Sequence, residues 1–414
     1  MCNRTNINNE LLKFAVDGIT PRSIERPSSI RELSELLLHC NQENTGIIPF
    51  GGKTRIHIGN PPLNYSIAVN LDKLPKYIDH EPGDMTVVSS SNVIVRELSE
   101  QLKINNQKLP FEVEQSSYAT IGGSVASDAE GRPQSSNGGI RDWIIGMENL
   151  TNTGKTTKSG GRVVKNVQGY DLHKLHIGGF GSLGVIKDCA FKLQPIPEQT
   201  ESIITTFDDF DTASSLCMQI FNFHFVPESL VLSNKTSDKN TTKLSLRLCG
   251  RKVGVERQKK EILNLFGENH LIKPHIISND DQFNFWDKLP TQKSELKIKI
   301  STTPLNIVPT IKYVKAIADS KSVEMRYLSD FAFGNVMIDF FDCNNDSAIT
   351  IIDEINNQIN ILLHSLVIQK CDTALKNHFD VFFLENSNKP VMLRIKNQYD
   401  PNRIFNAGRF AGKL

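Results

Sequence analysis

The 414-residue sequence predicts an α+β fold in two parts, on three observations. Up to residue 197, short apolar strands alternate with amphipathic helices across short links. Pro195 and Pro197 interrupt this pattern, and longer strand–helix–strand units follow them. Three glycine-dense turns lie in the first part, and the second part has no such turn. We therefore expect a first part that binds a ligand with its main chain, and a second part with an antiparallel sheet covered by helices on one face.

Apolar periodicity and capping residues define the elements of the first part. One helix is expected to begin after Ser28 or Ser29, and another has Val95, Leu98 and Leu102 on one face. In chain order we expect helices over 9–14 and 29–39, strands over 46–49, 66–71 and 85–90, a helix over 93–102, a hairpin of strands 143–150 and 155–159, and a strand over 185–193, with an extended segment at 55–59.

The second part repeats strand–helix–strand units. We expect strands over 202–207, 244–249, 297–301, 323–327 and 332–341, and helices over 212–223, 255–266 and 349–363. The tail after residue 393 differs from these units and is rich in Arg, Lys and Asn.

Composition excludes several classes of protein. Lys and Arg number 47 against 46 Asp and Glu, so no basic footprint for nucleic acid is evident. No window approaches the roughly 18 apolar residues of a membrane span, and residues 1–6 lack a signal-peptide core. The seven cysteines include no Cys-x-x-Cys pair, so no iron–sulfur cluster or metal site is expected. We expect a cytoplasmic protein with reduced thiols.

The glycine-dense segments are the most informative feature of the chain. They span Pro49–Thr54, Ala119–Asp128 and Gly178–Gly184. Small residues let the main chain approach a large flat ligand, and the main-chain N–H groups then become the binding groups. Three such segments predict one large cofactor held by main chain.

Two nucleotide-binding motifs fail to account for these segments. Gly52-Lys-Thr54 ends like a phosphate-binding loop, but the first glycine of that motif is missing at the required spacing, and Pro61-Pro62 prevent the helix that must follow. Gly179-x-Gly-x-x-Gly184 matches the dinucleotide fingerprint, yet a strand follows it at 185–193 instead of a helix. Neither a nucleoside triphosphatase nor a Rossmann domain is expected.

Longer motifs resemble a known family. The runs are Gly138-Gly-Ile-Arg-Asp-Trp-Ile-Ile-Gly146, Gly160-Gly-Arg-Val-Val-Lys-Asn-Val-Gln-Gly-Tyr-Asp171, Gly181-Ser-Leu-Gly-Val-Ile186 and Lys396-Asn-Gln-Tyr-Asp-Pro-Asn-Arg-Ile-Phe-Asn-Ala-Gly-Arg409. They closely resemble the FAD-binding E subunit of bacterial glycolate oxidase. The resemblance covers about residues 45–197 and 390–410 and is weak between them.

This resemblance implies a fold and a site. The fold is α+β, with a two-subdomain vanillyl-alcohol-oxidase-type FAD-binding domain over residues 1–197, a ferredoxin-like cap over 198–389, and a segment over 390–414 that returns to the FAD domain. FAD lies between the subdomains and is noncovalent, because no His lies inside the first glycine loop. The implied cofactor-binding residues are Gly51, Gly52, Lys53 and Thr54 for the pyrophosphate, Thr120, Ile121, Gly122, Gly123, Ser124 and Ser127 along the flavin, and Gly184, Val185 and Ile186 from the other subdomain.

The resemblance also implies a function, with two departures. Lys53 stands where the family often has a small residue, and either reaches a phosphate or is solvated. The cap segment Asp330–Val336 lacks the His with which catalytic relatives hold metal and substrate, so no catalytic base is assigned. We expect a subunit of an FAD-dependent oxidoreductase that acts on small 2-hydroxy acids, and this subunit either accepts a hydride or relays electrons through FAD. Its expected partners are a second flavoprotein subunit and an iron–sulfur subunit, through which it meets the membrane peripherally. The alternatives are a self-sufficient FAD-linked dehydrogenase or oxidase and a noncatalytic flavin-binding assembly subunit.

Several polar and aromatic residues leave two interpretations open. His173 and His176 either bind metal or pack, and packing is expected because no third ligand is evident. The pairs Arg141–Asp142 and Lys165–Tyr170 are either structural or close to the ligand. Trp286 either faces the flavin or anchors the cap. The tail cations Arg394, Lys396, Arg403 and Arg409 offer a clamp for a carboxylate.

Overall fold

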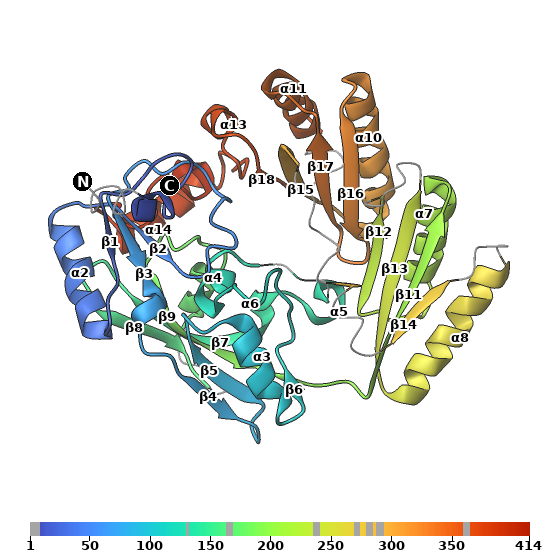
Figure 1. Cartoon of the computed structure of the whole chain (residues 1–414), viewed down its shortest axis with the longest axis horizontal. Helices are drawn as coiled ribbons and strands as arrows, with labels where there is room; N and C mark the ends of the chain where they lie inside the picture. The colour runs from blue at the N-terminus through green and yellow to red at the C-terminus, as the bar shows by residue number, and fades with distance from the viewer. Residues whose placement is uncertain are drawn as a thin grey trace. The chain divides into compact units, whose positions relative to one another are not determined.

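The computed structural model describes residues 9–129, 131, 133–162, 169–234, 241–268, 274–278, 285–286, 294–358 and 365–414. The chain forms two compact units. The first comprises Met1–Gly131, Gly139–Ile196 and Lys376–Leu414, and the second comprises Arg132–Gly138 and Pro197–Leu375. Figure 1 labels the helices and strands of both.

A small parallel sheet begins the first unit. Its strands are β1 (Ser23–Glu25), β2 (Ile47–Phe50) and β3 (Ile67–Asn70), in the order β1-β3-β2. The crossover helix α2 (Ile30–Gln42) begins at Ser29, whose side chain accepts a hydrogen bond from the N–H of Glu32, as the sequence predicted. Its apolar face packs against the sheet through Leu33, Leu37 and Cys40.

A five-stranded antiparallel sheet forms the second layer of strands in the first unit. Its order is β4-β5-β9-β7-β8. The strands are β4 (Ile78–Glu81), β5 (Thr86–Ser90), β7 (Ile144–Leu150), β8 (Thr156–Gly160) and β9 (Val185–Lys192). The helices of this part of the chain are η1 (Leu71–Lys73), α3 (Val95–Lys103), α4 (Ile121–Ala126), α6 (Ile140–Trp143) and η2 (Leu172–Leu175). A separate pair of short strands consists of β6 (Gln107–Lys108) and β10 (Gln194–Pro195). Both subdomain sheets of the expected fold are thus present.

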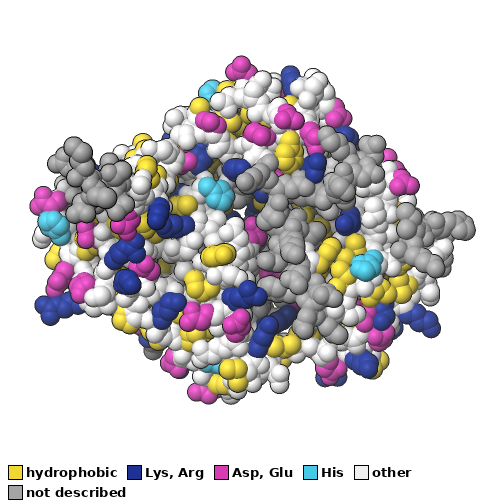
Figure 2. All heavy atoms as spheres, in the orientation of Figure 1, with side chains coloured by type: hydrophobic (Ala, Val, Ile, Leu, Met, Phe, Trp, Pro, Cys, Tyr) yellow, Lys and Arg dark blue, Asp and Glu magenta, His cyan; other side chains and the backbone are white. Residues whose placement is uncertain are grey.

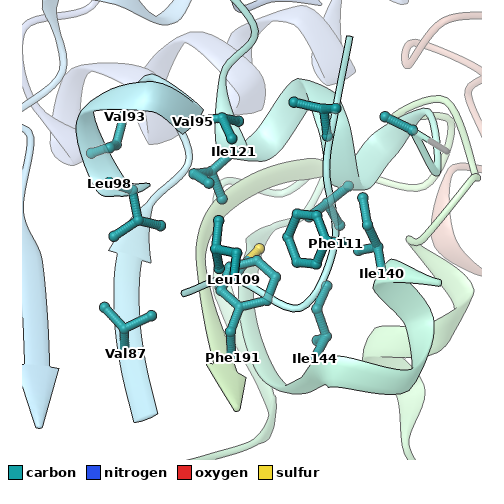
Figure 3. Packing of buried hydrophobic residues seen from close by; sticks show 14 of the residues in the cluster. Val87, Val93, Val95, Leu98, Leu109, Phe111, Ile121, Ile140, Ile144 and Phe191 are labelled. Carbon is teal, nitrogen blue, oxygen red and sulfur yellow. The ribbon is translucent and has the colours of Figure 1, made fainter. Parts of the chain in front are cut away.

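The main core of the first unit lies on this second sheet. Figure 3 shows Phe111 and Phe191 among aliphatic side chains from α3, α4 and the strands, and the two ring centroids are 5.5 Å apart. The expected helix face is confirmed, because Val95, Leu98 and Leu102 are all buried in this cluster. Two residues of α4, Ile121 and Val125, complete it. The core therefore fixes α4, which carries the second glycine segment.

The C-terminal segment returns to the first unit. It contains α13 (Thr373–His378), α14 (Lys389–Tyr399) and η4 (Ala411–Lys413). After α14 the chain runs beside β2, where the N–H of Ile47 donates to the carbonyl of Ile404 at 2.7 Å. Ile404 and Phe405 are fully buried in one cluster with Leu150 and Val185. The segment therefore packs in a core to which both sheets contribute side chains.

The second unit is a tandem repeat. The first βαββαβ repeat contains β11 (Gln199–Phe207), α7 (Phe210–Asn222), β12 (Ser229–Ser233), β13 (Thr242–Gly250), α8 (Lys252–Glu268) and β14 (His275–Ser278). The second contains β15 (Leu296–Ser301), η3 (Pro304–Asn306), α10 (Ile307–Ser320), β16 (Glu324–Asp330), β17 (Asn335–Phe341), α11 (Asn345–Asn356) and β18 (Ser365–Lys370). The short helix α5 (Gln134–Asn137) packs on β12.

One antiparallel sheet of eight strands unites the two repeats. Its order is β14-β11-β13-β12-β16-β17-β15-β18. Each half has the strand order of a ferredoxin-like fold, and β12 pairs with β16 at the junction. Figure 1 shows α7, α8 and α10 along one face of the sheet, and α11 packs on α10. The expected antiparallel sheet with helices on one face is confirmed, and the ferredoxin-like motif occurs twice.

Three local expectations were wrong. Residues 54–59 form turns and not an extended segment. The strand expected at 332–341 begins at Asn335, because a turn closes at Gly334, whose φ is +92°. Helix α10 was not expected; its Pro309 lies in the first turn, where the missing N–H costs nothing.

Candidate functional site

The first glycine loop, residues 51–54, follows the buried end of β2. A Cβ atom on Gly52 would overlap the carbonyl oxygen of Tyr118, and one on Gly51 would overlap the hydroxyl of Thr120. Only glycine fits at these positions while the loop keeps this path. Within the described part of the chain, no residue accepts a hydrogen bond from the four N–H groups of 51–54. The loop thus offers unused donors beside Thr120.

Lys53 has an unusual conformation for its position in this loop. Its φ is +61°, in the left-handed region that favours glycine. Its Nζ lies 3.3 Å from the centroid of the Phe14 ring and donates to the carbonyl of Lys13 at 3.2 Å. Burial lowers the pKa of this ammonium, and the nearby Arg26 adds to the effect. The structure therefore places the partly exposed ammonium of Lys53 on an aromatic ring.

The second glycine segment corrects an expectation. Instead of an open turn with free donors, residues Ile121–Ala126 form α4, and Thr120 caps it. The N–H of Ile121 donates to Val93 at 2.9 Å and that of Gly122 to Ser91 at 2.8 Å. The N–H of Gly123 donates to the Thr120 hydroxyl at 3.2 Å. These N–H groups are used within the protein, so α4 offers a surface and not a set of donors.

Side chains around α4 are committed to the helix as well. The hydroxyl of Ser124 donates to the carbonyl of Thr120 at 2.9 Å, and that of Ser127 to the carbonyl of Gly123 at 2.8 Å. Gly122 packs on Ser91, whereas Gly123 is exposed. Gly123 and Ser127 therefore mark the accessible side of α4.

The third glycine segment meets the C-terminal end of α4. The N–H of Gly178 donates to Val125 at 3.0 Å, and that of Phe180 donates to Ala126 at 2.8 Å. At the end of this segment Gly184 has φ +155°, and a Cβ there would lie 2.7 Å from the carbonyl oxygen of Leu150. The fold thus brings the first segment to the start of α4 and the third to its end.

The side chains of Ile121, Val185 and Ile186 do not line an open site. Val185 is buried in the cluster of the first sheet, and Ile186 in the cluster of the second. Ile121 is fully buried. Adjacent residues of a strand point to opposite faces, so β9 starts between two cores. A ligand therefore meets no exposed side chain of these three residues.

Two histidines near the third segment are buried in packing and hydrogen-bond contacts. His176 is 7% exposed, and its ring lies edge-to-face with Tyr399, with centroids 6.0 Å apart. Burial lowers the pKa of His176 to about 4, and the neighbouring His173 contributes. His173 is also buried, and its Nδ1 lies 3.1 Å from the Ser159 hydroxyl. Throughout the described ranges, no three metal-ligating side chains converge.

The remaining open interpretations resolve toward structural roles. Arg141 donates to the carbonyl of Lys174 at 3.0 Å, and Asp142 accepts from the N–H of Gly139 at 2.9 Å, so Arg141 and Asp142 do not pair. Trp286 is 3% exposed and donates to Ser202 at 2.8 Å, which anchors it on the sheet of the second unit. Lys165 lies outside the described residues.

Two of the four tail cations, Arg409 and Lys396, are buried and hold main-chain carbonyls, whereas Arg394 and Arg403 are exposed. Arg409 and Lys396 are both 2% exposed. Arg409 donates to the carbonyls of Ile56 and Ile58, each at 2.6 Å. Lys396 donates to the carbonyl of Ser182 at 2.7 Å and pairs with Asp400. Sequence reasoning missed these links, because nothing in the local pattern marks a cation as buried.

Comparisons with known proteins identify the class of the first unit. Residues 21–160 match the FAD binding domain family. The D-lactate dehydrogenase of Anaerostipes hadrus is 24% identical over 95% of this chain and 90% of that protein. The glycolate oxidase subunit GlcE of Escherichia coli (strain K12) is 28% identical over 41% of this chain and 49% of that protein. A solved structure of alkyldihydroxyacetonephosphate synthase is 15% identical, with a TM-score of 0.68 over 92% of this chain and 76% of that one.

These findings confirm part of the sequence-based interpretation. The chain carries an FAD-binding domain, so the cofactor is FAD, and the fold of the solved relative confirms the expected fold class. The enzyme class, an FAD-dependent oxidoreductase, is confirmed as well.

None of the described helices is both long and apolar enough to cross a bilayer. Figure 2 shows basic and acidic side chains interspersed on the drawn face, in keeping with a net charge of +1.

Proposed function

We propose that this chain is the FAD-binding subunit of a glycolate-oxidase-like 2-hydroxy-acid dehydrogenase and that it holds FAD noncovalently. One observation carries the proposal: the four N–H groups of residues 51–54 donate to no described residue, in a loop that glycine at 51 and 52 allows to pack closely on Thr120 and Tyr118. Phosphate oxygens are bound by convergent main-chain donors of this kind. The first loop fits a pyrophosphate better than α4 does, because the donors of α4 are used.

The proposed site extends from this loop along α4. The pyrophosphate lies on residues 51–54, beside Thr120. The flavin lies along the side of α4 that Gly123 and Ser127 mark as accessible, next to the buried Ile121, Gly122 and Ser124. Gly184, Val185 and Ile186 approach it from the far end, where Gly184 packs closely on the carbonyl of Leu150.

The chain's own residues bind and orient the cofactor in this proposal. When bound, FAD supplies the group that accepts a hydride from the substrate carbon that carries the hydroxyl. The buried clusters on both sides of β9 exclude water from the main chain of Val185 and Ile186. No residue is assigned as catalytic base.

Purification tests the cofactor and its mode of binding. The protein should be yellow, and acid precipitation should release the flavin into the supernatant, because residues 50–54 contain no His, Cys or Tyr for covalent attachment. A pellet that keeps the flavin would show covalent attachment. A colourless protein that takes up no FAD on reconstitution would refute the site.

We also propose dependence on a second flavoprotein subunit and an iron–sulfur subunit. The chain has no Cys-x-x-Cys pair with which to hold its own cluster, and its segment Asp330–Val336 has no His. A relative, GlcE, is itself named as a subunit. Co-expressed with such partners, the chain should copurify with them, and reduction of a dye by glycolate or D-lactate should appear only in the complex.

A self-sufficient dehydrogenase is the second candidate. It is favoured by the likeness to a D-lactate dehydrogenase that extends over 95% of this chain and 90% of that protein. Rapid mixing of the isolated, FAD-loaded chain with glycolate or D-lactate separates the two proposals. Fast bleaching of the flavin absorbance in the lone chain would select the self-sufficient enzyme, and unchanged absorbance would select the subunit.

A further inference from the structure

We infer that Arg409 is a positioning residue for the first glycine loop, and that the C-terminal segment, residues 376–414, couples this loop to the third glycine segment. The role in cofactor binding rests on the proposed function, whereas the mechanical coupling does not. The inference rests on buried cations that donate hydrogen bonds to main-chain carbonyls next to the first glycine loop and within the third glycine segment.

Three successive carbonyls behind the first loop accept hydrogen bonds from the C-terminal segment. Arg409 donates from one nitrogen, Nη2, to Ile56 and Ile58, each at 2.6 Å, and Lys376 donates from Nζ to His57 at 2.6 Å. Both cations are nearly inaccessible, with exposures of 2% and 3%. These carbonyls begin two residues after the 51–54 loop, so their position sets the direction in which the loop's free N–H groups point.

Burial makes the hydrogen bonds from Arg409 and Lys376 costly to break. A buried cation is costly unless its donors are satisfied, so displacement of the carbonyls would leave the guanidinium unpaired. Burial lowers the pKa of Arg409 to about 10, against the opposing charge of Asp17. Asp17 in turn pairs with Lys376 at 2.6 Å, so the two cations share one anion. Residues 54–59 form turns without a β-ladder, and these cations supply the order that a ladder would give.

The same segment holds the third glycine segment. Asn406 donates from Nδ2 to the carbonyl of Phe180 at 2.8 Å, and Lys396 donates to the carbonyl of Ser182 at 2.7 Å. Arg409 connects the two sets of contacts, because its Nη1 lies 3.5 Å from Oδ1 of Asn406. One short stretch of chain, 406–409, therefore fixes the distance between the two loops that are proposed to meet opposite ends of the cofactor.

The test compares Arg409→Lys with Arg247→Lys. Lysine keeps the charge at 409 but is shorter and has a single nitrogen, so it cannot keep both the Nη2 contacts to the two carbonyls and the Nη1 contact to Asn406. Arg247 is a matched control: it is buried at 6% exposure, is paired with Glu228, and belongs to the second unit. We expect FAD to bind Arg409→Lys about tenfold more weakly, the loss of one charge-assisted hydrogen bond, and to bind Arg247→Lys with parental affinity.

Amide hydrogen exchange in the apoprotein tests the coupling without FAD. The N–H groups of Ile56, Ile58 and Asn60, which are hydrogen-bonded in the parent, should lose protection in Arg409→Lys, and thermal unfolding should change no more than in Arg247→Lys. Asn406→Gly serves if Arg409→Lys does not fold; its glycine suits the φ of +45° at this position, and protection should fall at 178–182. Unchanged protection in these segments would overturn the inference, as would an equal loss of FAD affinity in the control. If the parent binds no FAD, the proposed function fails, and hydrogen exchange still decides the coupling.

Discussion

Gly122 and Gly123 are adjacent, yet the structure gives them different roles. A Cβ atom on Gly122 would lie 2.6 Å from Cβ of Ser91, whereas one on Gly123 would meet only the Thr120 hydroxyl, at 3.0 Å. We expect Gly122→Ala to lower the free energy of unfolding by about 2 kcal/mol, because an overpacked contact must shift. Gly123→Ala should change it by less than about 1 kcal/mol and should weaken FAD binding instead. Urea titration of both apoproteins and FAD titration check this, and equal destabilisation would contradict it.

His176 should make the stability of the protein sensitive to acid. Its folded pKa of about 4 lies below the unfolded value of 6.5, so the unfolded state binds the proton more readily between these values. Stability is full above about pH 6.5 and falls as the pH drops toward about 4, by roughly 3 kcal/mol from this residue. His173, whose pKa burial also lowers, acts in the same direction.

Replacement of His176 checks this pH dependence. His176→Gln should flatten the fall in unfolding free energy between about pH 6.5 and pH 4. His39→Gln, at an exposed position of α2, is the control and should leave the slope unchanged. A parental slope in His176→Gln would assign the acid sensitivity to other groups.

At the level of elements, the start of α2 depends on a single side chain. Ser29 accepts a hydrogen bond from the N–H of Glu32 at 3.1 Å, and the Glu32 carboxylate accepts from the N–H of Ser28 at 2.8 Å. We expect Ser29→Ala to destabilise the protein by about 1 kcal/mol, because an N–H at the helix start loses its acceptor. Ser34→Ala, in the middle of the same helix, should have little effect. Thermal unfolding of both variants tests the cap, and similar midpoints would argue against it.

Periodicity predicted most elements, and tertiary contacts decided the exceptions. The apolar face of α3 and the cap of α2 are local signals, so both were predicted correctly. The helix at 121–126 was not predicted, because Gly122 and Gly123 are poor helix formers. It forms because Thr120 caps it and Ile121 and Val125 are buried in the core. The sequence located the glycine segments of the candidate site. It did not show which segment has free N–H donors, because tertiary contacts decide which N–H groups are used.

At the level of the whole molecule, the two tryptophans report on different units. Trp143 belongs to the first unit and Trp286 to the second, and the chain has no others. FAD at 100 times its dissociation constant should stabilise the unit that binds it by about 2.7 kcal/mol, or roughly 5–10 °C. We expect this rise in unfolding temperature in the Trp286→Phe variant, where the fluorescence of Trp143 reports on the first unit. The rise should be smaller in Trp143→Phe, where Trp286 reports on the second unit. Equal shifts would show that the two units unfold as one.

The junction of the second unit has a consequence for its origin. Strands β12 and β16 hold equivalent places in their repeats, and they pair antiparallel through Val231–Ser233 and Leu328–Asp330. Equivalent strands joined in opposite directions are related by a local dyad, as in a homodimer whose sheets merge edge to edge. The unit thus has the symmetry of an ancestral half-length domain that was duplicated and fused. Either half produced alone would expose β12 or β16 as an open edge and should self-associate through it.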